Sequence, residues 1–222
     1  MLGRVAGWLL PGDTNKHGVL PALLIPLTFV TGLVDAVSFM GLNKVFVANM
    51  TGNVVFVGFT LAGERDLSLW SSLLAITAFV AGAWTAGRLV ARSAAVERAF
   101  TPITGAHLAF VTTALVVSVI FGHQATGAQA ALISLLAFGM GMQNAVVRKL
   151  AVPDMTTTVL TADITGLASD SPGVAGRRRL VSVVAMCAGA LCGGLLHIHV
   201  GPPGALALAL VLLAGVAVAG RG

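Results

Sequence analysis

Long apolar segments decide what this chain can fold into. There are eight of them, at about residues 20–42, 45–62, 69–91, 103–121, 127–147, 154–168, 179–199 and 203–220. A helix needs about 20 mostly apolar residues to cross a bilayer, and segments 45–62 and 154–168 are shorter or more polar than the rest. The segments are continuous and do not alternate with period two, so they predict α-helices and exclude a membrane β-barrel.

The composition also indicates a membrane protein. Of the 222 residues, 57% are hydrophobic and 9% are charged, whereas a soluble domain carries about 25% charged residues. The net charge of +5 does not indicate a nucleic-acid partner, because cytoplasmic loops of membrane proteins are enriched in Lys and Arg. The chain has no Tyr, and no aromatic and basic platform for bases is evident. We predict an all-α membrane protein whose partners include lipids.

An internal repeat divides the chain. LTFVTGLVDAV (27–37) aligns with LAFGMGMQNAV (136–146), MTGNV (50–54) with LTADI (160–164), and AGAWTAGRLV (81–90) with AGALCGGLLH (188–197). The three alignments follow one another in the same order and at nearly equal offsets, so order and spacing are kept. We predict an N-terminal cytoplasmic or interfacial segment at 1–19, a first transmembrane repeat at 20–122 and a second at 123–222.

The distribution of positive charge favours six spans. If segments 45–62 and 154–168 each enter and leave on one side, Lys44 and Arg65 lie outside, and every other Lys and Arg lies inside. If all eight segments cross, the positive charges are nearly balanced between the sides. The positive-inside rule therefore predicts three spans per repeat, two inverted repeats, short re-entrant or broken helices, and both termini in the cytoplasm.

Polar residues inside apolar segments are the candidate site. Asp35 lies about fifteen residues into the first long segment, where a carboxylate costs about 3 kcal/mol even on the mildest scale. Inverted repeats with broken helices are a known transporter plan, with binding near the midplane. The predicted substrate- or ion-binding residues are Asp35, Asn49, Thr51, Asn53, Gln143, Asn144, Thr161 and Asp163. The alternative is that these residues make only structural hydrogen bonds between helices.

Other polar residues have simpler explanations. Asp154 is a candidate cap for a helix beginning beside Thr156, and Arg148 and Lys149 are candidate interfacial anchors. Cys187 and Cys192 are predicted to be packing residues. His197 and His199 point to different helix faces, which disfavours a metal pair. No nucleophile elbow, HExxH motif or P-loop occurs, so we predict no enzyme, no cofactor and no metal site.

Two stretches resemble a known family. TGLVDAVSF followed by VFVANMTGNVVFVGF, and GMQNAVVRKLAVPDMTTTVLTADITGLASD, are similar to the signature stretches of the YoaK-like proteins. The resemblance extends from about residue 20 to 215 and implies a multi-pass protein of the bacterial inner membrane with about six spans. It implies no substrate, since the family is classed as a domain of unknown function.

The expected function is transport of a small solute by a proton-coupled secondary carrier, with a site between the repeats. Asp35 and Asp163 are the expected titrating or cation-binding groups, because buried carboxylates can exchange protons near neutral pH. A passive channel for a small neutral solute, or a non-transporting protein with a structural or partner-binding role, stays open. The substrate, coupling ion, direction of transport and oligomeric state, including a homo-oligomer, are left undetermined by the sequence.

Overall fold

The computed structural model describes residues 1–10, 18–155, 157–158, 160–171 and 173–221, and this part of the chain contains helices and no strand. Six of these helices are long and apolar enough to cross a membrane. They are α2 (Leu20–Gly41), α4 (Leu69–Arg92), α5 (Val96–Phe121), α6 (Thr126–Leu150), α8 (Val174–His199) and α9 (Pro202–Ala219). The predicted all-α membrane fold with about six transmembrane helices is confirmed.

Three shorter helices complete the described chain. They are α1 (Leu2–Leu9), α3 (Met50–Leu61) and α7 (Leu160–Ser169). With a rise of 1.5 Å per residue, α3 and α7 are only about 18 and 15 Å long, and a bilayer core is about 30 Å thick. Neither of the two can cross the membrane as a helix.

Four helix boundaries differ from the predicted segments. Segments 45–62 and 154–168 begin as loops, so α3 and α7 start at Met50 and Leu160 and the predicted Asp154 cap is wrong. Thr156, beside that predicted cap, lies outside the described residues. Helix α5 starts earlier than predicted, at Val96, and has Pro102 in its interior. Helix α8 also starts earlier, at Val174, and includes a cluster of three arginines, Arg177, Arg178 and Arg179.

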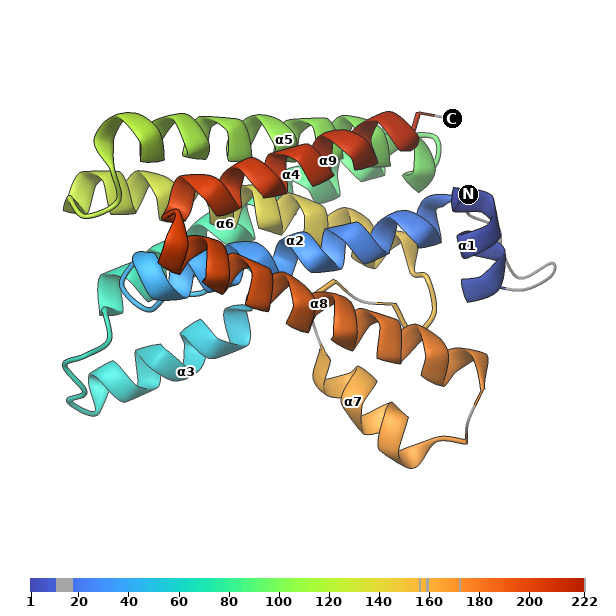
Figure 1. The fold of residues 1–222 in the computed structure, drawn as a ribbon, viewed down its shortest axis with the longest axis horizontal. Helices are drawn as coiled ribbons and strands as arrows, with labels where there is room; N and C mark the ends of the chain where they lie inside the picture. The colour runs from blue at the N-terminus through green and yellow to red at the C-terminus, as the bar shows by residue number, and fades with distance from the viewer. Residues whose placement is uncertain (11–17, 156, 159, 172, 222) are drawn as a thin grey trace.

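The bundle has two distinct ends. Both termini lie at one end, which is here named the terminal end (Figure 1). There Arg178 Nη1 donates to the Leu9 carbonyl at 3.1 Å, and Thr101 Oγ1 donates to the Gly220 carbonyl at 2.7 Å. At the other, the distal end, Asn43 Nδ2 donates to Gln129 Oε1 at 2.8 Å. Because α2 ends at the distal end and α6 ends at the terminal end, these two helices run in opposite directions.

Each short helix leaves and returns to the bundle at a single end. Lys44 and Arg65 lie on either side of α3, and both line one hollow at the distal end. Asp154 and Asp170 lie on either side of α7, and both accept hydrogen bonds from Arg179 at the terminal end. Figure 1 shows α3 and α7 on the same side of the long helices, one towards each end.

Glycines set two close helix crossings. A Cβ on Gly32 of α2 would lie 2.1 Å from the Met186 carbonyl oxygen of α8, and one on Gly141 of α6 would lie 2.1 Å from the Phe79 carbonyl oxygen of α4. Gly189 and Gly82 occupy the reciprocal positions, since a Cβ added to either would lie 2.0 Å from a carbonyl oxygen of the opposite helix. Small residues let membrane helices approach this closely, so α2 packs on α8 and α4 packs on α6.

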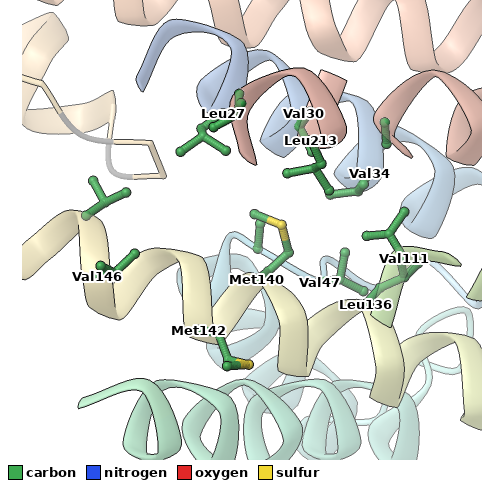
Figure 2. Close-up of a cluster of buried hydrophobic side chains, with 14 of the residues drawn as sticks. Leu27, Val30, Val34, Val47, Val111, Leu136, Met140, Met142, Val146 and Leu213 are labelled. Atoms are coloured by element: carbon green, nitrogen blue, oxygen red, sulfur yellow. The ribbon is translucent and has the colours of Figure 1, made fainter. Parts of the chain in front are cut away.

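The hydrophobic core joins these two pairs. Helices α2 and α6 are its centre, and α5 and α9 cover them on one side. Figure 2 shows Leu27, Val30 and Val34 of α2 opposite Leu136 and Met140 of α6. The site described next lies on the other side, where the short helices begin.

Candidate functional site

The loop before α3 is built around Asp35. The Val47 and Ala48 amides donate to Asp35 Oδ1 at 2.9 and 2.8 Å, and Asn49 Nδ2 donates to Asp35 Oδ2 at 2.5 Å. Asp35 itself is 4% exposed. Backbone amides in an apolar setting need acceptors, and the carboxylate supplies them where the helix has not yet begun. Asp35 therefore places Asn49 at the start of α3.

The loop before α7 repeats this arrangement without the carboxylate. Asn144 Nδ2 donates to Thr158 Oγ1 at 2.6 Å, across fourteen residues, as Asn49 and Asp35 are fourteen residues apart. Ala151 and Asp154 adopt left-handed backbone conformations in this loop, as Asn43 and Lys44 do in the first. Asn144 therefore places Thr158 just before α7.

Asn53 and Asp163 are buried inside the two short helices. Asn53 is fully buried; its Oδ1 accepts from the Phe46 amide at 3.0 Å and its Nδ2 donates to the Phe46 carbonyl at 2.6 Å. Asp163 is 3% exposed on α7. Asn53 thus ties its own helix to the preceding loop and does not face open space.

A cavity of about 450 Å³ lies where the two short helices begin, and it is here named the central cavity. It is lined by Ala48, Asn49, Met50, Thr51, Phe79, Asn144, Thr158, Leu160, Thr161, Ile164 and Met186. Both halves of the chain contribute corresponding residues, since Thr51 aligns with Thr161 and Phe79 with Met186 in the register of the repeat. The walls are mainly apolar with a few hydroxyls and amides, which is typical of a small-molecule site.

The structure brings half of the predicted site residues together. Those that line the central cavity are Asn49, Thr51, Asn144 and Thr161. Asp35 lies behind Asn49, while Asn53, Gln143 and Asp163 do not line this cavity. Gln143 is buried in the core, where its Nε2 lies 3.3 Å from Thr31 Oγ1. The two acids therefore do not meet in one chamber.

An ionic cluster closes the terminal end beside α7. Arg178 Nη2 lies 2.6 Å from Asp154 Oδ2, Arg179 Nη2 lies 2.7 Å from Asp154 Oδ1, and Arg179 Nη1 lies 2.6 Å from Asp170 Oδ2. Burial raises the pKa of Asp154, but hydrogen bonds from the two arginines outweigh it and hold the pKa below its ordinary value. The Arg179 guanidinium also packs against Gly166, where a Cβ would lie 2.3 Å from Nη1. This cluster clamps both ends of the α7 segment to α8.

Sequence reasoning missed two contributors to the site. Thr158 lines the central cavity, and the signal that could have identified it is its position, which aligns with Asn49 in the register of the first repeat alignment. Arg148, interpreted as a membrane anchor, lines two neighbouring hollows together with Asn144. Its position one helical turn after Asn144 on α6 was the corresponding signal.

Comparison with known proteins agrees with this architecture. The family model described as "Protein of unknown function (DUF1275)" matches residues 23–219. The chain belongs to the DUF1275 family. A curated relative, the UPF0700 transmembrane protein YoaK of Bacillus subtilis (strain 168), is 29% identical over 153 residues, which cover 68% of this chain and 67% of YoaK. The resemblance to the YoaK-like family is confirmed.

No solved structure matches the chain. The family description names no substrate or activity.

Proposed function

We propose that this protein transports a small solute through the central cavity. The observation that carries the proposal is that corresponding residues of both halves line one cavity at the starts of two short helices. Residues Asn49 and Thr51 come from the first half, and Thr158 and Thr161 from the second. Discontinuous helices beginning at a shared cavity are typical of transporter binding sites.

Inverted repeats are part of the proposal. The glycine crossings support them, because Gly32 and Gly141 occupy aligned positions of the sequence repeat, and so do the residues that they contact, Phe79 and Met186. The opposite directions of α2 and α6 support an inversion. An inverted pair lets one rearrangement open the cavity to either side of a membrane.

We place the terminal end in the cytoplasm of a bacterial cell, with the protein in the inner membrane. Among the described residues, Lys44 and Arg65 lie at the distal end, whereas the arginine cluster at 177–179, Arg148 and Lys149 lie at the terminal end. The positive-inside rule favours this orientation. Lys16 falls outside the described residues. The proposed ligands are lipids and the solute, and no catalytic role is proposed.

Proton coupling through Asp35 and Asp163 is the finer part of the proposal. Asp35 is buried and no cation pairs with it among the described residues, so the protonated form leaves no uncompensated buried charge. Protonation of Asp35 would weaken the hydrogen bonds that its carboxylate accepts from Val47, Ala48 and Asn49. Because Ala48 and Asn49 line the central cavity, proton binding would thereby change the conformation of the cavity wall.

A passive channel for a neutral solute is the second candidate. The observation that favours it is that three donors already satisfy the Asp35 carboxylate, so Asp35 can hold the loop before α3 without exchanging a proton. Flux that ignores a proton gradient would select the channel. A non-transporting role would be selected by the absence of flux for every solute tested.

The test uses purified protein in liposomes loaded with a pH-sensitive dye. Small anionic, cationic and neutral solutes are added with and without a pH gradient, and solute uptake and proton movement are recorded. Thr161→Phe should block flux by filling the cavity, whereas Thr165→Phe, one turn further along α7 and outside the cavity, should not. If Asp35→Asn and Asp163→Asn both leave uptake and its pH dependence unchanged, the coupling proposal is wrong.

A further inference from the structure

Matching side cavities in the two halves differ in their charge. The first-half cavity, of about 280 Å³, has walls formed by Gly32, Asp35, Ala36, Phe39, Met40, Phe46, Asn49, Met186 and Ala190. The second-half cavity, of about 410 Å³, has walls formed by Phe79, Ala83, Gly87, Asn144, Ala145, Arg148 and Lys149. Each lies between one glycine-crossed helix pair, α2 with α8 and α6 with α4.

The charge difference between the two side cavities arises at aligned positions of the sequence repeat. Where the first half has Asp35, the second half has Asn144 at the aligned position. Where the first half has Phe39 and Met40, the second half has Arg148 and Lys149 in the same register. The second-half cavity therefore lacks a carboxylate and carries two cations in addition. A membrane anchor needs only to sit at the interface, so the position of both cations in a cavity wall calls for a further explanation.

A third hollow, of about 370 Å³, adjoins this cavity and shares Asn144 and Arg148 with it. Thr157 also lines this hollow; it is 1% exposed, and its hydroxyl has no hydrogen-bond partner among the described residues. Arg148 likewise has no ion pair within the described part of the chain. An unpaired buried hydroxyl costs about 1–3 kcal/mol, and a ligand that accepts its proton would remove that cost.

We infer that the second-half cavity binds an oxyanion, a carboxylate or phosphate group, held by Arg148 and Lys149. A guanidinium fork matches the two oxygens of such a group. Asn144 supplies a neutral donor in this cavity, and Thr157 supplies one in the adjoining hollow, which shares Asn144 and Arg148 with it. This inference rests on the proposed function in one respect: the oxyanion belongs to the transported solute, which enters or leaves through this cavity at the terminal end. An anionic lipid headgroup has the same chemistry, so the experiment separates the two sources.

The experiment measures oxyanion binding directly, without transport. Purified protein in a neutral detergent is titrated with sodium phosphate and sodium acetate by calorimetry, with sodium chloride at matched ionic strength as the reference. Wild type should bind phosphate or acetate, and the double variant Arg148→Gln, Lys149→Gln should bind at least about tenfold more weakly. Arg92→Gln, at the end of α4 and at the same end of the bundle, is the matched control and should bind like wild type.

Asn144→Asp is the second variant, and it restores the carboxylate that the first half has at Asp35. It should weaken binding through repulsion while leaving Arg148 and Lys149 in place. Equal phosphate and acetate binding by wild type and the double variant, or no binding by wild type, overturns the inference.

Nanodiscs separate the two sources of the oxyanion. Protein is compared in phosphatidylcholine alone and in phosphatidylcholine with phosphatidylglycerol. Acetate and phosphate binding that persists in the anionic nanodiscs supports a soluble anion. Loss of that binding, with phosphatidylglycerol retained by wild type and not by the double variant in native mass spectrometry, assigns the site to a headgroup and overturns the solute assignment. Oxyanion binding without flux would contradict the proposed function and the assignment of the oxyanion to a transported solute, but not the oxyanion site. Flux of a neutral solute without oxyanion binding would contradict this inference alone.

Discussion

Asn144 donates to the Thr158 hydroxyl at 2.6 Å, fourteen residues further along the chain. The pair mirrors Asn49 and Asp35, which are joined across the same separation in the first half. In both halves a long helix thus holds the loop that leads into a short helix. Only the first half uses a carboxylate, so we expect the two loops to differ in stability.

Removing the Asp35 carboxylate should cost more than removing the Thr158 hydroxyl. Asp35→Ala leaves the buried Val47 and Ala48 amides without their acceptor, and we expect a loss of about 3–5 kcal/mol in the free energy of unfolding. Thr158→Val removes one neutral acceptor and should cost about 1 kcal/mol. Unfolding in mixed micelles, followed by tryptophan fluorescence, measures both. Equal losses would contradict the role assigned to Asp35.

A methyl group at the α4–α6 crossing should separate the helices. The Cβ of Gly141→Ala would lie 2.1 Å from the Phe79 carbonyl oxygen, and overpacking of this kind costs about 1–3 kcal/mol. Gly87→Ala on α4 is the control, because no atom lies within 4 Å of its Cβ position. The control should be neutral or slightly stabilising, since Ala favours helix more than Gly. Thermal unfolding in detergent distinguishes the variants, and similar midpoints would argue against a close crossing.

The Asp154 cluster should make stability depend on acid pH. Arg178 and Arg179 hold the pKa of Asp154 below its ordinary 3.8, so its contribution is complete above that value and is lost as the pH falls through the lower folded-state pKa. Asp154→Asn should cost about 2 kcal/mol at neutral pH, and the difference from wild type should shrink at more acid pH. Asp66→Asn, at an exposed position of the distal end, is the control and should change the free energy of unfolding little. A difference that stays constant with pH would rule out the ion pairs as its source.

Cysteine labelling tests the path of the short helices. In a background with Cys187 and Cys192 replaced by Ala, single cysteines at Lys44 and Asp66 should react with an impermeant reagent from the same side of the membrane. Cysteines at Pro153 and Ser171 should react together from the opposite side, because each pair flanks a segment that returns to its own end of the bundle. Labelling of Lys44 and Asp66 from opposite sides would make α3 a spanning segment.

Much of the fold could be predicted from the sequence because the length of each apolar segment shows whether it can span a membrane. The starts of α3 and α7 could not, because Val45, Val47 and Ala48 are apolar but belong to a loop. Their conformation depends on Asp35, a tertiary contact that hydropathy does not contain. Likewise Arg178 and Arg179 lie far from Asp154 in the sequence, and their pairing with it is evident only in the folded chain.

Site residues were harder to separate from structural ones. Asn53 and Asn49 are both amides in the same apolar stretch, yet Asn53 is turned into the loop backbone and Asn49 lines the cavity. Their separation along the chain is about one helical turn, too short a distance for sequence pattern to assign opposite roles. The repeat was more informative, since the first alignment, extended along the chain, pairs Asn49 with Thr158, and the second pairs Thr51 with Thr161.

The glycine crossings also restrict how the molecule can move. At Gly32 and Gly141 the backbones meet with no side chain between them, so neither helix pair can slide without a clash. Each pair, α2 with α8 and α4 with α6, therefore behaves as a rigid body. If the central cavity widens, we therefore expect one pair to tilt against the other, with the pivot at α5 and α9, which pack against α6 and α2.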